Sequence, residues 1–146
     1  GTLRFKHGIA RDVIYDSVGL HQRNALHKRI ADTLREHGPS GAQEEVWELL
    51  AYHYGACRQV VEAAQYAEAA GDKAATASAL DRAQIQYGAA LTALDPDASQ
   101  ENYERWMSIV QRLALACVFD PSRNQLEFLR RAVVCGRPWP FAPATA

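Results

Sequence analysis

Two side chains near the middle of the sequence have the spacing of metal ligands. His53 and Cys57 are four residues apart, and on a helix this spacing puts an imidazole and a thiolate on one face, at two corners of a tetrahedral zinc site. A structural zinc site takes four protein ligands, and no third ligand is evident near this pair. We therefore expect an ordinary helix surface here, with no metal and no cofactor.

Motifs for nucleotide or acyl chemistry are absent from the sequence. It has no G-x-x-x-x-G-K-[ST] loop to cradle phosphates and no pair of metal-holding aspartates in the strand context that a nucleotide cyclase needs. The five histidines are scattered, and none has the local context of a Ser/His/Asp or Cys/His catalytic set. We expect no enzyme activity in these residues. The alternative, a nucleotide-handling enzyme fragment, predicts a heat of binding with ATP or GTP.

The other candidate side chains fit structural roles. His27 follows Arg23 by four residues, one helical turn, and we expect the two to join one helix to another. Cys117 lies on an apolar helix face, where a thiol acts as a small hydrophobic side chain. His7 fits two roles: it caps its segment or bonds a backbone carbonyl, or it contacts a nucleotide-bearing domain of a longer protein.

Composition limits the class of protein. With 146 residues and a formal charge of -1, the chain lacks the basic excess of general nucleic-acid binders. No apolar run approaches the roughly 20 residues that span a bilayer. Three widely spaced cysteines favour reduced thiols in the cytoplasm over a disulfide framework. We expect a soluble, cytoplasmic chain with neither nucleic acid nor a membrane as its partner.

Charge is unevenly distributed along the sequence. Residues 41–102 hold 3 basic and 10 acidic residues, whereas residues 1–40 hold 7 basic and 4 acidic ones and residues 103–146 hold 6 and 3. An acidic middle between basic ends favours a cationic partner or a neighbouring basic domain. The alternative is a solvated helical surface with no partner.

Breakers divide the sequence into helix-sized pieces. The expected breaks are at residues 38–41, at Gly71-Asp72, at residues 95–97 and at Asp120-Pro121. Between them the apolar spacing is near 3.6, as in the stripes Phe5-Ile9-Val13 and Leu26-Ile30-Leu34. We predict an all-α fold of about eight helices. The predicted pairs are 43–57 with 60–70, 72–79 with 80–94, and 99–118 with 122–135.

The middle of the sequence has the spacing of a helical hairpin. Its two helices carry the motifs Trp47-x2-Leu50-Ala51-x2-Tyr54 and Ala63-x3-Ala67-x2-Ala70. Large residues on one helix and alanines on the next let two antiparallel helices approach closely. This pattern resembles the tetratricopeptide repeat, and Ala83-x3-Tyr87-x2-Ala90 matches its second half. Because the intervals between motifs are irregular, we expect a degenerate TPR-like array of stacked antiparallel hairpins.

A second face of the first repeat helix is the candidate binding site. If the Trp47 motif packs inward, then Glu45, Glu48 and Tyr52 lie together at i, i+3 and i+7. In tetratricopeptide arrays this face lines the groove that takes peptides. Glutamates there would repel an anionic terminus, so we expect a basic or apolar segment. The alternative is a solvated face with a half-buried tyrosine.

The first forty residues carry a more distinctive pattern. Residues 5–17 read FKHGIARDVIYDS and are followed by Arg23-x2-Leu26-His27-x2-Ile30-Ala31-x2-Leu34. This resembles the segment of STAND-type signalling ATPases that hands over from the ATPase and winged-helix region to a C-terminal repeat array. Many bacterial members carry a class III adenylate or guanylate cyclase domain. The resemblance covers roughly residues 3 to 95 well and residues 99 to 135 loosely.

The resemblance implies an organisation and a function. Residues 1–40 would be a helical joint, residues 41–136 the hairpins, and residues 137–146 a proline-rich tail. The module would be non-catalytic and regulatory, and would bind a protein or peptide, including other domains of the same protein. The alternative from a different class is a small-molecule sensor that holds its ligand between the alanine-rich helices.

Overall fold

A computed structural model describes residues 19–37, 46–118 and 123–134 of the chain. These ranges contain helices and short turns and no strand, which confirms the all-α prediction. The six helices are α2 (Leu20–His37), α3 (Trp47–Ala56), α4 (Val60–Thr76), α5 (Leu80–Ala93), α6 (Gln100–Ala116) and α7 (Arg123–Val134). The predicted count of about eight is not confirmed.

Several predicted features lie outside the described residues. They are the stripe from Phe5 to Val13, His7, the loop at residues 38–41, Glu45, Asp120-Pro121 and the tail at residues 137–146. The predicted stripe on α2 is described, and Leu26 and Ile30 are largely exposed on it. The buried residues of α2 are instead His27 and Ala31.

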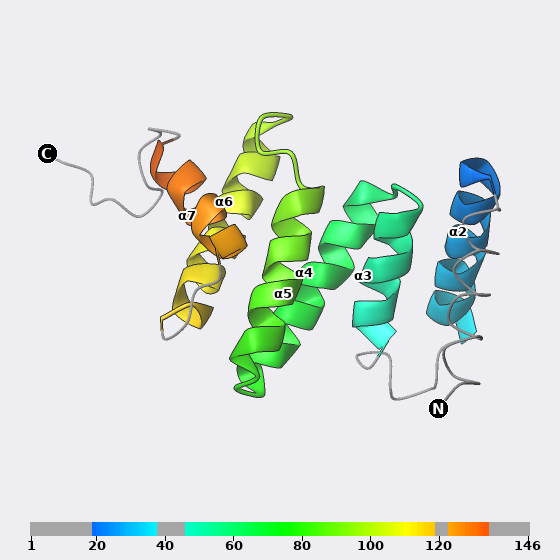
Figure 1. Ribbon diagram of the computed structural model, residues 1–146, viewed down its shortest axis with the longest axis horizontal. Helices are drawn as coiled ribbons and strands as arrows, with labels where there is room; N and C mark the ends of the chain where they lie inside the picture. The colour runs from blue at the N-terminus through cyan, green and yellow to red at the C-terminus, as the bar shows by residue number, and fades with distance from the viewer. Residues whose placement is uncertain (1–18, 38–45, 119–122, 135–146) are drawn as a thin grey trace, which may run out of the picture.

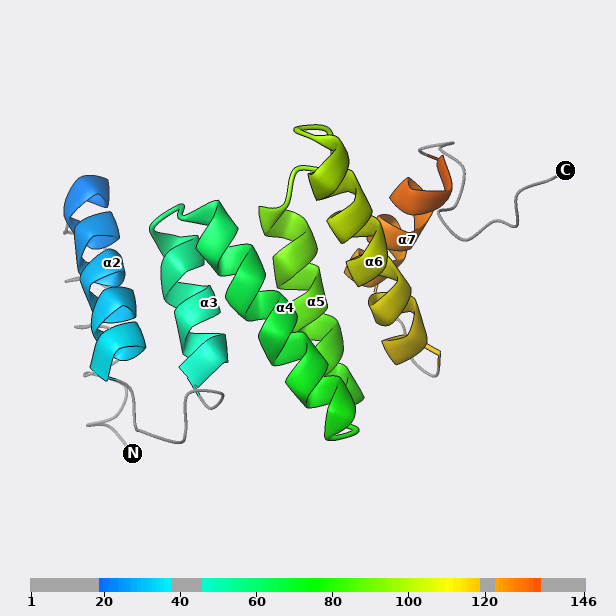
Figure 2. The same ribbon diagram turned by 180° about the vertical axis from the view of Figure 1, so that it is seen from behind.

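The helices form a row in two layers. In Figure 1, α5 and α7 lie in front of α4 and α6, and Figure 2 shows the reverse. Each helix packs mainly on its neighbours in sequence, and contacts also join α3 to α5 and α5 to α7. Because consecutive helices turn back on each other, α3 and α5 run in the same direction. The two helices can therefore present side chains to one surface.

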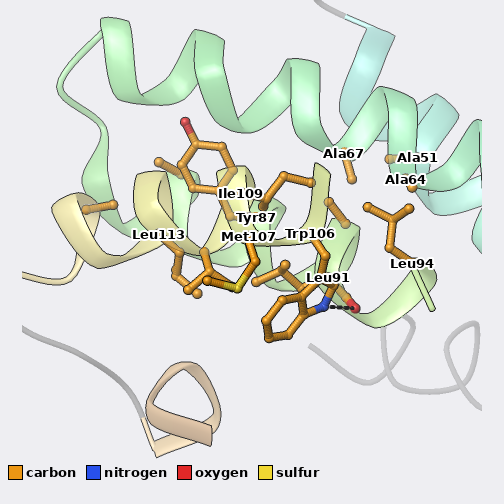
Figure 3. Close-up of a cluster of buried hydrophobic side chains, with 14 of the residues drawn as sticks. Ala51, Ala64, Ala67, Tyr87, Leu91, Leu94, Trp106, Met107, Ile109 and Leu113 are labelled. Atoms are coloured by element: carbon orange, nitrogen blue, oxygen red, sulfur yellow. Dashed lines mark hydrogen bonds between the residues drawn. The ribbon is translucent and has the colours of Figure 1, made fainter. Parts of the chain in front are cut away.

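Most of the buried side chains form one cluster that runs from α3 to α7. Among its most deeply buried large side chains are Trp106, Met107 and Ile109 on α6 and Tyr87 on α5 (Figure 3). The Trp106 indole N–H donates to the carbonyl of Leu91 at 3.4 Å, so burial leaves no unpaired polar atom on this ring. A smaller cluster joins α2, α3 and α4 around Ala31, Leu50, Tyr54, Cys57 and Ala63.

Alanines let α4 pack closely on both α3 and α5. Ten residues were expected to pack in the hairpins, and the structure buries nine of them: Leu50, Ala51, Tyr54, Ala63, Ala67, Ala70, Ala83, Tyr87 and Ala90. The tenth, Trp47, is partly buried and packs against the smaller cluster. The pairing of α3 with α4 agrees with the predicted pair 43–57 with 60–70.

The predicted break at Gly71-Asp72 is wrong, and so is the separate helix at residues 72–79. Helix α4 continues unbroken to Thr76. Gly71 is buried against the ring of Tyr87, and a Cβ atom there would lie 2.6 Å from the ring atoms Cδ1 and Cε1. The glycine is therefore present for the close approach of α5, and it does not end the helix.

The actual turns occur at residues that carry no glycine signal. Arg58 and Ser78 have φ values of 61° and 58°, in the left-handed region that costs a non-glycine residue about 1–2 kcal/mol. The N–H groups of Arg58 and Gln59 donate to the carbonyls of Gly55 and Tyr54 at 3.1 and 2.9 Å. Ser78 and Ala79 repeat this pattern after α4. Both turns are thus Schellman motifs with an unusual residue at the left-handed position.

Adding a methyl group at Gly71 is expected to destabilise the protein by about 1–3 kcal/mol, because an overpacked core must distort. Tyr87 cannot move aside easily, since its hydroxyl donates to Asp72 at 2.8 Å and the ring is buried. Urea unfolding of Gly71→Ala followed by circular dichroism measures the loss.

Gly88→Ala is the matched control for this prediction. A Cβ atom there would lie 3.8 Å from the Phe128 ring, which is ordinary contact. Because alanine is the better helix former by about 1 kcal/mol, this variant should be as stable as the wild type or more stable. Equal effects of the two substitutions would contradict the close-approach role of Gly71.

Candidate protein-binding face

The two described members of the predicted binding face differ in their surroundings. Tyr52 is 61 % exposed, with its side chain on the surface of α3. Glu48, one turn before it, is partly exposed and forms an ion pair with Arg82 of α5. The pair therefore joins α3 to α5 at the first turns of both helices.

Apolar residues continue this face from α3 onto α5. Ile85 follows Arg82 by three residues and is 63 % exposed. Since α3 and α5 run in the same direction, Tyr52 and Ile85 each lie about one turn beyond the Glu48–Arg82 pair. Two large exposed side chains thus follow a charged pair, an arrangement suited to a partner with apolar side chains.

A groove lies between α5 and α7, with Ile85 in its lining. It has a volume of about 500 Å³ and is lined by Gln84, Ile85, Gly88, Thr92, Gln125, Glu127 and Phe128. Gln84 is buried at its base, and its amide nitrogen donates to the carbonyl of Ala116 at 2.8 Å. Ile85 lines the groove and is exposed beside it. We call Glu48, Tyr52, Ile85 and Phe128 the α3–α5–α7 face.

Tyr52 also borders a pair of histidines. The Nδ1 atoms of His27 on α2 and His53 on α3 are 2.8 Å apart, and the Tyr52 ring meets both imidazoles edge-on. Burial, and secondarily the neighbouring His27, lower the pKa of His53. His27 thus joins one helix to another as predicted. Arg23, its predicted companion, has its Nε atom buried.

Charged side chains connect the two helices of the opposite layer. Arg112 on α6 donates through Nη1 to both carboxylate oxygens of Asp72 at 2.7 and 2.8 Å, and through Nη2 to Glu68. Arg105 donates to Glu68 at 2.8 Å. The guanidinium of Arg112 also lies 5.6 Å from the centre of the Tyr87 ring. This network holds α4 against α6.

The network keeps its arginine charged. Burial lowers the pKa of Arg112, but the hydrogen bonds to Glu68 and Asp72 outweigh it and the pKa is raised. Burial and the bond to Asp72 raise the pKa of Tyr87. The sequence prediction missed this network. Its only signals are the spacings of Glu68 with Asp72 and of Arg105 with Arg112, which are common on solvated helices.

The cysteines show no reactive environment in the part of the chain that the structure describes. Cys57 and Cys117 are both buried, and burial raises the pKa of the Cys117 thiol, which keeps it protonated. His53 approaches His27, whereas the thiol of Cys57 donates to the carbonyl of Tyr54. Among the described residues, no three His, Cys, Asp or Glu side chains are grouped as a metal site.

Comparison with known proteins gives no relative. No family model matches the sequence, and neither a curated protein nor a solved structure matches it significantly. The described helices include none with the length and apolar character needed to cross a bilayer. The likeness to signalling ATPases therefore rests on the residues of this chain.

Proposed function

We propose that this chain is a TPR-like module of a STAND-type signalling protein and binds a protein segment in the cytoplasm without catalysis of its own. The observation that carries the proposal is the α3–α5–α7 face. It exposes Tyr52 on α3, and Ile85 of α5 lines a groove of about 500 Å³ between α5 and α7. Exposed aromatic and aliphatic side chains at a concave surface are the usual anchors of a protein interface.

The packing of α3 on α4 supports the TPR-like assignment. Leu50 and Tyr54 of α3 share a buried cluster with Ala63 of α4, and Ala51 shares another with Ala67. The spacing of large residues and alanines therefore corresponds to real contacts. With α5 and α7 in front of α4 and α6 (Figure 1), successive helices alternate between two layers as in stacked hairpins.

The α2 segment supports the STAND assignment. Within the motif from Arg23 to Leu34, the structure buries His27 and Ala31 against α3. The motif would thus dock the joint onto the first hairpin. In the whole protein, we propose, this array holds an ATPase or cyclase domain in an inactive arrangement.

The partner is a segment with apolar and basic side chains. Tyr52 and Ile85 offer apolar contacts, and Glu127 places a carboxylate in the groove that Ile85 lines. A peptide rich in leucine and lysine satisfies both, whereas one with glutamate in place of lysine is repelled.

Peptide binding measured by fluorescence anisotropy tests the proposal. We expect the chain to bind a short amphipathic Leu/Lys peptide and not its Leu/Glu counterpart. Because Tyr52 would be a central anchor, Tyr52→Ala should weaken binding about tenfold or more. Val61→Ala is the control, since Val61 is 66 % exposed but lies on α4. Equal affinity for the two peptides, or binding to neither, would contradict the proposal.

A second candidate is a small-molecule sensor, favoured by the size of the same groove. Its volume of about 500 Å³ lies in the range of roughly 300–1,000 Å³ that ligand pockets occupy. A thermal-shift screen of metabolites distinguishes the candidates. A metabolite that raises the melting temperature of the wild type but not of Phe128→Ala would favour sensing.

A further inference from the structure

The attachment of α2 to the array depends on few side chains. Only His27 and Ala31 are buried on this helix, and within the described residues α2 packs chiefly on α3. The Tyr54 hydroxyl adds a hydrogen bond to Asp32 at 3.1 Å. A change at His27 therefore acts on a large part of this small interface.

The contact between His27 and His53 restricts the protons that the two rings can carry. Their Nδ1 atoms are 2.8 Å apart and the ring centres 5.1 Å, so one nitrogen must donate and the other accept. Two neutral rings satisfy this, and so does one neutral ring beside one imidazolium. Two imidazolium rings do not, because both nitrogens then carry protons and two positive charges adjoin. The second proton therefore breaks the contact.

Charged and titratable groups around the pair come from both helices. On α3 these are Tyr52 against both rings, Glu48 in its ion pair with Arg82, and the Cys57 thiol, which donates to a backbone carbonyl.

On α2, Arg23 lies one turn before His27. Lys28 and Arg35 flank Asp32, whose carboxylate also accepts from Tyr54. The carboxylates of Glu48 and Asp32 thus already have cationic partners. Arg23 adds positive charge.

We propose that the His27–His53 contact makes the docking of α2 on α3 pH-sensitive, so that a second proton on the pair releases α2 while helices α3 to α7 stay folded. The large cluster that holds α3 to α7 together includes no residue of α2. Release uncovers Leu50 and Tyr54 of the smaller cluster and removes one ring from the side of Tyr52. This inference does not rest on the proposed function.

The direction of the pH effect follows from the two states. A released histidine has the ordinary pKa of about 6.5, whereas burial and the neighbouring His27 lower the pKa of docked His53. At a pH between the pKa of docked His53 and that of a released histidine, the state with α2 released binds more protons than the docked state. Docking of α2 on α3 therefore weakens as the pH falls. The contribution of the His27–His53 contact to docking is fully present above about pH 6.5. One proton changes the docking equilibrium by at most about tenfold per pH unit.

Hydrogen exchange of the full chain tests the inference. Protection of the α2 amides is measured relative to α5, with intrinsic exchange rates corrected, between about pH 7.5 and 5. We expect the relative protection of wild-type α2 to fall by up to about fivefold between pH 6.5 and 5.5, the limit for one proton with a released-state pKa of about 6.5. His53→Gln should abolish this loss, because the amide can donate to or accept from His27 in either protonation state.

His21→Gln is the matched control, since His21 is an exposed histidine on the same helix. It should keep the wild-type pH dependence. If His53→Gln leaves α2 undocked at every pH, then His27→Gln takes its place with the same expected result. Relative protection of wild-type α2 that is constant with pH would overturn the inference. So would a wild-type pH dependence in both glutamine variants of the pair.

Discussion

Replacing Trp106 with alanine is expected to lower the free energy of unfolding by about 3–5 kcal/mol, the usual cost of removing a buried aromatic ring. The side chain is fully buried in the cluster that joins α3 to α7. Its loss also leaves the carbonyl of Leu91 without the indole N–H and the guanidinium of Arg131 without the ring. Because domains are stable by only about 5–15 kcal/mol, we expect a large shift in the urea midpoint.

Trp47→Ala is the control for that measurement. Trp47 begins a motif with the same spacing, since residues 47, 50, 51 and 54 correspond to 106, 109, 110 and 113. Trp47 is only partly buried at the edge of the smaller cluster. It should therefore cost clearly less than Trp106→Ala, since less apolar area leaves water on folding. An equal loss for both, or a loss below about 1 kcal/mol for Trp106→Ala, would contradict the central position of Trp106.

The helical hairpin was predictable because its signal is local. Trp47, Leu50, Ala51 and Tyr54 share one face of a helix, so spacing alone places them together. The same holds for Trp106 and the buried positions that follow it on α6. Such a stripe needs a neighbour to cover it, and the next helix in the chain is the nearest one.

The break predicted at residues 95–97 is confirmed, because it lies between the end of α5 at Ala93 and the start of α6 at Gln100. The ends of α3 and α4 were less predictable, because their local signals were misleading. A glycine such as Gly71 often marks the end of a helix. Here its missing side chain leaves room for the ring of Tyr87, which lies on another helix. Ser78 and Arg58 do end helices, but neither residue favours the left-handed region. Hydrogen bonds in the turn and the packing of the next helix stabilise that conformation, and neither is visible in single residues.

The candidate face was predictable only in part. Spacing put Glu48 and Tyr52 on one face, because both lie on α3. The contributions of Ile85 and Phe128 depend on how α5 and α7 stack in the same layer. The partner of His53 was missed for the same reason: His27 lies 26 residues away on another helix. Contacts between helices depend on the stacking, which the local period does not determine.

Replacing Arg112 with methionine is expected to cost about 2–3 kcal/mol. Breaking a buried ion pair costs about 3–5 kcal/mol, and breaking an exposed pair costs about 1 kcal/mol or less. The exposure of this network is intermediate, since Glu68 is mostly buried and Asp72 is half exposed. The expected loss arises because both carboxylate oxygens of Asp72 lose the Arg112 Nη1 that donates to them, and Glu68 loses Nη2. Urea unfolding at low salt measures it.

Two comparisons make the Arg112 prediction specific. Arg82→Met removes an ion pair with Glu48 that is largely exposed, so it should cost less than about 1 kcal/mol. Arg112→Lys should recover only part of the loss, because an ammonium cannot replace the guanidinium that binds Asp72 and Glu68 together. An Arg112→Met variant as stable as Arg82→Met would show that the network does not hold α4 against α6.

The Arg112 network also bears on how the array transmits a change. Glu68 and Asp72 lie on α4 and Arg112 on α6, so the network joins helices that are not neighbours in sequence. Packing between consecutive helices fixes each hairpin, whereas this contact fixes the angle between one hairpin and the next. Arg112→Met should therefore change the spacing of α4 and α6, measured by spin labels on exposed Gln65 and Ser108. Unchanged distances would confine the role of Arg112 to stability.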